Sequence, residues 1–197
     1  MFRYNVINNC FNTDNKIYLE IGICSGETYS NVKYKFKDGV DPYPNHHGVK
    51  YTNFKMTSDE FFNNHCNKKY DIIFIDGLHH SEQVVKDFNN SINFLNDNSY
   101  IIFDDIYPKN KTMQVIPRPE KGQPAGPGTP WTGDCWKCLL NILDNVSDDK
   151  YELKIYTSEN YFGVATLLIK KQFNILNFDY DYDSDFDRYI NKLNMVL

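Results

Sequence analysis

Two apolar runs that end in acids are the parts of this sequence best suited to chemistry. DIIFID (71–76) ends at Asp76 and is followed by Gly-Leu-His-His, and SYIIF (99–103) is followed by Asp104 and Asp105. Three carboxylates in one place repel one another unless a hard cation such as Mg²⁺ neutralises them through oxygen ligands. A neighbouring imidazole, with an unperturbed pKa of about 6.5, could then take the proton of a hydroxyl group. Both His79 and His80 qualify as this base, and the acids could instead simply cap a turn.

A glycine-containing turn follows a third apolar run. KIYLEIG (16–22) predicts a buried strand, and Gly22 and Gly26 in GICSG allow the chain to turn and a ligand to approach the backbone. Asp41 ends the next predicted strand, where a nucleotide-binding α/β fold places the acid that binds ribose hydroxyls. An ordinary strand-to-helix turn remains the alternative.

The predicted strands and helices that must position these residues alternate along the chain. Short β-like runs separated by amphipathic segments predict a mostly parallel sheet covered by helices on both faces. We expect seven strands, the last of them antiparallel, over 16–22, 36–42, 53–58, 70–76, 99–105, 151–158 and 161–170. Helices are expected after Glu27, over 59–66, 81–95 and 132–146, and at the end of the tail. Ligands bind beyond the carboxyl ends of such strands, so the acids of neighbouring strands should meet there.

The chain is predicted to form a single domain over residues 1–197. Residues 107–130 hold six of the eight prolines and predict a lid on the acceptor side, with Arg118, Lys121 and Trp131 as possible contacts. Residues 174–197 predict an acidic link and a helix. The acidic run DYDYDSDFD (179–187) lacks the glycine and glutamate of a calcium-binding EF-hand loop.

The composition and net charge of the chain disfavour several classes of partner. The net charge is −5 and there is no long basic run, which disfavours nucleic acid and anionic membranes. No apolar run is long enough to span a bilayer, and the amino terminus lacks the apolar region of a signal peptide, so a cytoplasmic protein with reduced cysteines is expected. The pair Cys135 and Cys138 is weak support for a zinc or redox site.

The segment LEIGICSG (19–26) resembles the first motif of the class I S-adenosylmethionine-dependent methyltransferases, which has the form E/D-x-G-x-x-x-G. The resemblance implies a Rossmann-like methyltransferase fold with S-adenosylmethionine as cofactor. It also implies that Asp41 binds the ribose and that Ser58 lies near the adenine. The residues implied for the cofactor loop are Glu20, Gly22, Gly26 and Thr28.

The two segments that contain Asp76 and the pair Asp104 and Asp105 are similar to those of one subgroup of these enzymes. FIDGLHHSEQVVKD (74–87) and IIFDDIYP (101–108) resemble the macrocin and novobiocin-type sugar O-methyltransferases and the cephalosporin-hydroxylase-like proteins. The resemblance implies Asp76, Asp104 and Asp105 as ligands of Mg²⁺ or another divalent cation. It implies His79 as the base, with His80 as the alternative, and Asp76 as a second catalytic residue.

The resulting expectation is divalent-metal-assisted O-methylation of a small hydroxylated acceptor such as a sugar or glycan unit, in a protein that could form a homodimer. A non-catalytic cofactor-binding module on the same fold is an alternative. A nicotinamide-dependent oxidoreductase is another, although the chain lacks the GxGxxG motif typical of that class.

Overall fold

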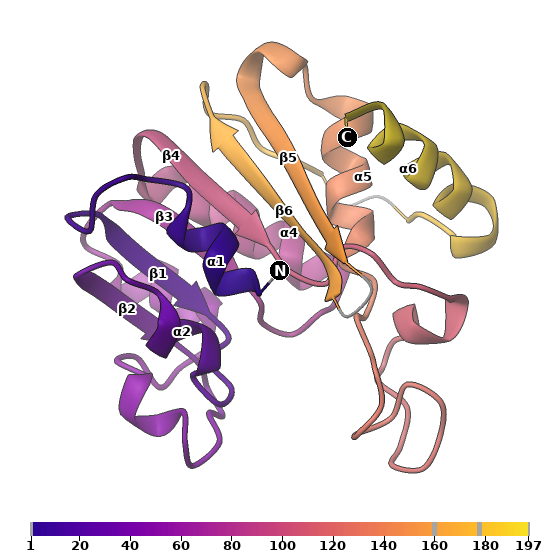
Figure 1. Cartoon of the computed structure of the whole chain (residues 1–197), viewed down its shortest axis with the longest axis horizontal. Coiled ribbons are helices and arrows are strands. Elements are labelled where there is room, and N and C mark those ends of the chain that lie inside the picture. The colour runs from indigo at the N-terminus through magenta and orange to yellow at the C-terminus, as the bar shows by residue number, and fades with distance from the viewer. Residues whose placement is uncertain (1, 159–160, 177–178, 197) are drawn as a thin grey trace.

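A six-stranded sheet forms the centre of the computed structural model, which describes residues 2–158, 161–176 and 179–196 (Figure 1). The strand order is β2-β1-β3-β4-β6-β5. The first four strands along the chain are parallel, whereas β6 runs antiparallel to both β4 and β5. The strands are β1 (Ile17–Ile21), β2 (Phe36–Val40), β3 (Tyr70–Ile75), β4 (Leu95–Phe103), β5 (Tyr151–Ser158) and β6 (Tyr161–Ile169).

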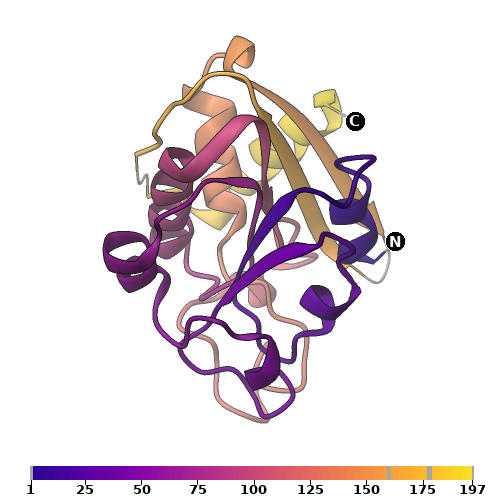
Figure 2. The same ribbon diagram turned by 90° about the vertical axis from the view of Figure 1, so that its left-hand side faces the viewer.

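Helices cover both faces of the sheet, which Figure 2 shows edge-on between them. One face carries α1 (Arg3–Asn8) and α2 (Glu27–Asn31), and the other carries α4 (Ser81–Ser91) and α5 (Trp136–Asn145), with α6 (Tyr182–Val196) in the same core cluster as α5. The remaining turns of helix are α3 (Ser58–Glu60), η1 (Val49–Tyr51), η2 (Phe61–His65), η3 (Ile92–Phe94), η4 (Lys111–Gln114) and η5 (Asp148–Lys150). The predicted Rossmann-like layering is confirmed. No described helix has the length and apolar character needed to cross a membrane.

The central strand β3 explains the unbroken apolar run in the sequence. Ile73 and Ile75 point into the core cluster beneath α4 and α5, whereas Ile72 and Phe74 point into the cluster beneath α1 and α2. A parallel strand buried on both faces cannot alternate apolar with polar residues. Each such side chain stabilises the fold by about 1.5–3 kcal/mol through burial.

The strand predicted over 53–58 is wrong, and the sheet therefore has six strands instead of seven. Only Phe54 pairs with the edge strand β2, through an isolated bridge to Val40. The side chain of Asn53 accepts a hydrogen bond from the backbone N–H of Gly39, which anchors the segment beside the strand without a ladder. Thr57 then caps α3 by accepting from the N–H of Glu60, so the chain turns into a helix after one pair.

Residues 179–181 of the acidic run near the carboxyl terminus precede α6, and the rest of the run forms the first turns of that helix. Asp181 Oδ1 accepts hydrogen bonds from the backbone N–H groups of Asp183 and Ser184, at 2.9 and 3.3 Å. A carboxylate at the start of a helix accepts hydrogen bonds from free backbone N–H groups, and its negative charge interacts favourably with the positive end of the helix dipole. The run therefore has a structural explanation.

Candidate active site

A cavity of about 780 Å³ lies at the carboxyl ends of β1, β2, β3 and β4. The long connections 41–57 and 107–135 both extend from this end of the sheet (Figure 1). The residues that follow the strands and line the cavity include Gly22 and Cys24 after β1, Asp41 and Tyr43 after β2, Asp76 and His79 after β3, and Asp104 and Asp105 after β4. Parallel strands thus bring segments far apart in the sequence to one point, as the sequence predicts.

The turn after β1 depends on glycine for steric reasons. Gly22 has φ +91°, and a Cβ at this position would lie 2.0 Å from the carbonyl oxygen of Asp76. Its N–H donates to the carbonyl of Val40 at 2.9 Å. Gly22 therefore lets the ends of β1 and β3 approach one another at the floor of the cavity. Gly26 has a different constraint, because a Cβ there would lie 2.1 Å from Cδ2 of Tyr51.

Asp41 is held rigidly towards this turn. Its Oδ2 accepts from the N–H of Cys24 at 2.8 Å and its Oδ1 accepts from the N–H of Tyr43 at 2.7 Å. Each carboxylate oxygen has a second lone pair, so the side chain can still accept from a hydroxyl pair in the cavity. Ser58 also lines the cavity and accepts a hydrogen bond from the amide of Gln83 at 3.3 Å.

The structure does not bring all of the predicted cofactor residues to the cavity wall. Gly22, Asp41 and Ser58 line it, but Glu20, Gly26 and Thr28 do not. Glu20 is buried and accepts a hydrogen bond from the hydroxyl of Tyr18 at 2.6 Å. Burial raises the pKa of Glu20 to about 8, against the opposing effect of that hydrogen bond.

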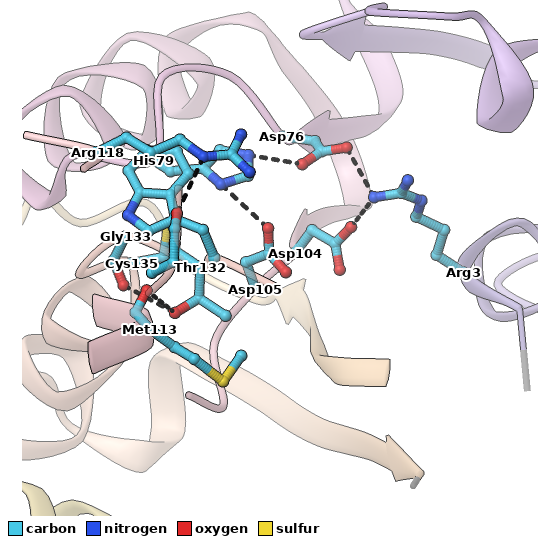
Figure 3. A network of polar contacts seen from close by, with 12 residues as sticks. Arg3, Asp76, His79, Asp104, Asp105, Met113, Arg118, Thr132, Gly133 and Cys135 are labelled. Carbon is cyan, nitrogen blue, oxygen red and sulfur yellow. Dashed lines mark hydrogen bonds and ion pairs between the residues drawn. The ribbon is translucent and has the colours of Figure 1, made fainter. Parts of the chain in front are cut away.

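The other side of the cavity holds the acids and the imidazole that the sequence singles out (Figure 3). His79 Nε2 lies 3.2 Å from Asp76 Oδ1, and His79 Nδ1 lies 3.0 Å from Asp105 Oδ2. Burial lowers the pKa of His79, but the hydrogen bond to Asp76 and the charges of Asp105, Asp76 and Asp104 outweigh it and raise the pKa to about 9. The imidazole is therefore protonated at neutral pH and balances part of the acidic charge. His80 is not among the residues that line the cavity.

Asp104 and Asp105 lie next to other charged groups, and the backbone is strained at Asp105 and His79. Burial raises the pKa of Asp104, helped by the charge of Asp76 and opposed by Arg3. Burial also raises the pKa of Asp105, and the adjacent charge of Asp104 adds to this. Asp105 has φ +56° and His79 has φ +60°, a backbone region that residues other than glycine rarely adopt. Such strain is characteristic of functional sites.

Arg3 completes the cluster, and the sequence gives no sign of it. Its Nη1 lies 2.9 Å from Asp76 Oδ2 and also pairs with Asp104 Oδ2 (Figure 3). The partners are 73 and 101 residues away along the chain. Arg3 stands at the start of α1, whose position follows from the burial of Val6 and Ile7 beneath it.

The connection predicted as a lid ends against the imidazole. The ring of Trp131 stacks on the ring of His79 at 5.2 Å between centroids, with an interplanar angle of 8°. Its Nε1 donates to the carbonyl of Val115 at 2.8 Å. The carbonyl of His79 in turn accepts from the N–H of Asp134 at 3.2 Å. Residues 115–134 are thus connected directly to the segment that carries the candidate base.

Arg118 has a structural task in the same connection. It donates hydrogen bonds to the carbonyls of Ala125, Gly126 and Thr129, at 3.3, 3.5 and 3.2 Å. Its guanidinium also lies 5.0 Å from the ring of Trp131. Most of its donors are therefore used to fold the connection, although the side chain still borders the cavity.

Asp134, the last residue of the segment Thr132-Gly133-Asp134, was not among the predicted site residues. It is buried and accepts from the N–H and the hydroxyl of Ser81, at 2.6 and 2.9 Å. Ser81 is the first residue of α4, so Asp134 caps that helix from the far end of the 107–130 connection. The sequence signal that could have identified Asp134 is an aspartate that follows a glycine, next to a predicted helix.

Three side chains of the cluster fit a divalent cation. Asp76, His79 and Asp105 each offer one ligand atom, and these atoms lie within 4.8 Å of one another. His79 Nδ1 is buried and faces Asp105 Oδ2 at 3.0 Å without forming a hydrogen bond of good geometry. The imidazole favours an ion such as Mn²⁺ or Zn²⁺ over Mg²⁺, which prefers oxygen ligands. The predicted set of Asp76, Asp104 and Asp105 differs, because Asp104 is engaged by Arg3.

Comparison with known proteins identifies the family to which this sheet and cavity belong. A family model described as a methyltransferase domain matches residues 19–106, from β1 to just beyond the acid pair. A protein of Acanthamoeba polyphaga mimivirus, named uncharacterized protein R132, is 32% identical over 164 residues, which cover 70% of this chain and 74% of that protein. The chain belongs to the same family as this viral protein, and its matched region is that of a class I S-adenosylmethionine-dependent methyltransferase.

Solved structures show that this methyltransferase shares its fold with enzymes that act on different atoms. The O-methyltransferase from Bacillus cereus in complex with SAH has a TM-score of 0.54 at 13% identity and covers 85% of this chain and 78% of its own. The O-methyltransferase TomG from Streptomyces achromogenes in complex with SAM has 0.56 at 10%, covering 84% and 77%. The N-methyltransferase NodS from Bradyrhizobium japonicum WM9 has 0.51 at 11%, covering 86% and 95%. At such identities the likeness establishes the fold, and the acceptor must be argued from the site.

Proposed function

We propose that this methyltransferase transfers a methyl group to a hydroxyl oxygen of a small acceptor, with a sugar or glycan unit as the leading class. The observation that carries the proposal is a single cavity with two chemically different sides. Gly22, Asp41 and Ser58 line the side suited to a nucleoside. Asp76 and His79 line the side suited to removing a proton.

The nucleoside side fits the cofactor of the family. Asp41 presents carboxylate oxygens that are already oriented by two backbone N–H groups. Such preorganisation lowers the cost of binding a pair of ribose hydroxyls. S-adenosylmethionine supplies a methyl group on a positively charged sulfur, already activated for transfer. The task left to the protein is to position the acceptor and to remove its proton.

His79 is the proposed base. It must be neutral to accept a proton, and its pKa of about 9 keeps most of it protonated at neutral pH. A positive charge bound beside the imidazole would lower this pKa towards neutrality. Asp76 holds Nε2 and orients the ring, which is the usual part of an acid paired with a catalytic histidine.

The acceptor side has features that suit a sugar. Carboxylates accept hydrogen bonds from hydroxyl groups, and three of those that border the cavity, Asp76, Asp104 and Asp105, follow β3 and β4. The rings of Trp131 and Phe162 border it as well. Aromatic rings of this kind can pack against the apolar C–H face of a sugar ring, so both kinds of contact are available.

A metal-assisted form of the same reaction is the second candidate, and the convergence of Asp76, His79 and Asp105 favours it. These three residues would hold the cation, which when bound would lower the pKa of a coordinated hydroxyl. A neutral imidazole has one free lone pair. His79 can therefore be either the ligand or the base, and the two forms are exclusive.

Calorimetry with S-adenosylhomocysteine tests the cofactor side. Asp41→Asn should weaken binding about 10- to 100-fold, because a charged acceptor of hydrogen bonds is lost. The exposed Asp14→Ala provides a control outside the cavity. Equal affinities for all three proteins would remove Asp41 from the proposal.

Transfer of a labelled methyl group from S-adenosylmethionine tests the reaction. A panel of free sugars, sugar phosphates, phenols and amines should give product with hydroxyl acceptors, and the product should withstand treatment that hydrolyses esters. Labelling of amines alone would contradict the oxygen acceptor. Activity that is unchanged by EDTA would separate the base mechanism from the metal-assisted one.

A further inference from the structure

Arg3 lies where a cation between two carboxylates would lie. Its Nη1 contacts Oδ2 of Asp76 and Oδ2 of Asp104 together. The side chain of Asp104 is only 5% exposed. Among the described residues, the ion pairs of Asp76, Asp104 and Asp105 are formed by Arg3 and His79 alone.

This contact divides the acid cluster into two halves. One half consists of Arg3, Asp104 and Oδ2 of Asp76. The other consists of Oδ1 of Asp76, His79 and Asp105, whose ligand atoms converge. Asp76 belongs to both halves through different oxygens. A carboxylate oxygen that already contacts a guanidinium is a poor ligand for a second cation, because the two positive charges repel. Asp76 still offers Oδ1, whereas Asp104 has no atom in the converging set.

We propose that Arg3 is a positioning residue and a built-in cation, which holds Asp104 away from divalent metal and confines any metal to Asp76, His79 and Asp105. The inference adds to the proposed function, since it concerns the same site. It explains how one buried and two half-buried carboxylates coexist, because uncompensated buried charge is strongly unfavourable. It also makes α1 part of the active site.

The position of Arg3 is set by contacts of α1 outside the site. The carbonyl of Ile7 accepts from the hydroxyl of Tyr34 at 2.8 Å. Asn8 accepts from the N–H of Lys33 at 2.8 Å and donates to the carbonyl of Asn31 at 3.1 Å. These contacts do not involve the Arg3 side chain, so a substitution of Arg3 should leave the helix docked.

Binding of Mn²⁺ alone to the full chain tests the proposal, measured by electron paramagnetic resonance of the free ion. Arg3→Gln should increase the affinity for Mn²⁺ by about tenfold or more, because a repelling charge is removed and Asp104 becomes available. Arg3→Lys keeps the charge and should stay close to the native protein. The double variant R3Q/D104N should lose most of the gain.

A matched control removes a different cation. Lys16 pairs with Asp71 at 3.1 Å, outside the cavity, and Lys16→Gln changes the net charge equally. Its Mn²⁺ affinity should equal that of the native protein. Equal or weaker binding by the folded Arg3→Gln variant, or a gain of the same size in Lys16→Gln, would overturn the proposal. So would the absence of Mn²⁺ binding in every variant.

The same samples separate this inference from the proposed function. Binding of S-adenosylhomocysteine to the native protein tests the cofactor side and does not depend on Arg3 acting as a cation. A native protein that binds no S-adenosylhomocysteine would contradict the proposed function and leave the Mn²⁺ comparison valid. Circular dichroism of each variant shows whether the fold is retained.

Discussion

The indole ring of Trp131 lies parallel to the imidazole of His79, with 5.2 Å between the ring centroids. Trp131 comes from the proline-rich connection after β4, whereas His79 follows β3. A flat aromatic partner limits rotation of the imidazole and excludes water from one of its faces. The connection that the sequence identifies as a lid therefore also positions the candidate base.

Trp131→Ala should slow methyl transfer without weakening cofactor binding. Aromatic stacking contributes about 0.5–1.5 kcal/mol, which corresponds to about a two- to tenfold loss of rate. Trp131→Phe keeps a stacking ring and should recover most of it. Initial rates would measure methyl transfer, and calorimetry with S-adenosylhomocysteine would measure cofactor binding. A parallel loss of cofactor affinity in the alanine variant would place Trp131 on the wrong side of the cavity.

The pH dependence of methyl transfer should follow His79. A base acts only when neutral, and the pKa of this group is raised to about 9, so kcat/KM should rise with pH, reach half of its maximum near pH 9 and level off above it. That parameter reports the free enzyme. His79→Gln should lower the rate about 100-fold and flatten the profile. His80→Gln is the matched control and should keep the native profile. A rate independent of pH between 6 and 9 would exclude a proton transfer to His79.

The same pKa gives the sign of an effect on stability. Because the folded-state pKa of His79 lies above its unfolded value of about 6.5, its stabilising contribution is complete below about pH 6.5. It is lost as the pH rises through about 9. Urea denaturation at several pH values should therefore show the native protein losing more stability between pH 6.5 and 9 than His79→Gln.

Gly22→Ala should destabilise the fold more than an equivalent change at an open glycine. A Cβ at Gly22 would overlap the carbonyl oxygen of Asp76, whereas one at Gly122 meets no atom within 4 Å, and both have φ near +90°. Gly122→Ala should cost about 1–3 kcal/mol for the backbone strain alone. Gly22→Ala should cost about 1–3 kcal/mol more for the overlap. Equal free energies of unfolding would show that the ends of β1 and β3 separate easily.

Local patterns predicted much of the fold because burial leaves a local signature. From Ile72 to Ile75, β3 is apolar on both faces, and α4 repeats its apolar residues on one side. The segment 53–58 shows why such patterns can fail. Its residues alternate in exposure like a strand, yet the pairing with β2 stops after Phe54 because Thr57 begins a helix.

The amino-acid sequence by itself determined that acids, glycines and histidines follow buried strands, and hence that Asp41, Asp76, His79, Asp104 and Asp105 meet at one edge of a parallel sheet. Only the tertiary structure decided how those charges are divided. Arg3 reaches Asp76 and Asp104 because α1 packs on the same face of the sheet as α2. Trp131 reaches His79 because the carboxylate of Asp134 caps α4. Contacts of this kind depend on where whole helices and connections pack against the sheet. The residues next to Arg3 or Trp131 in the sequence do not indicate that position.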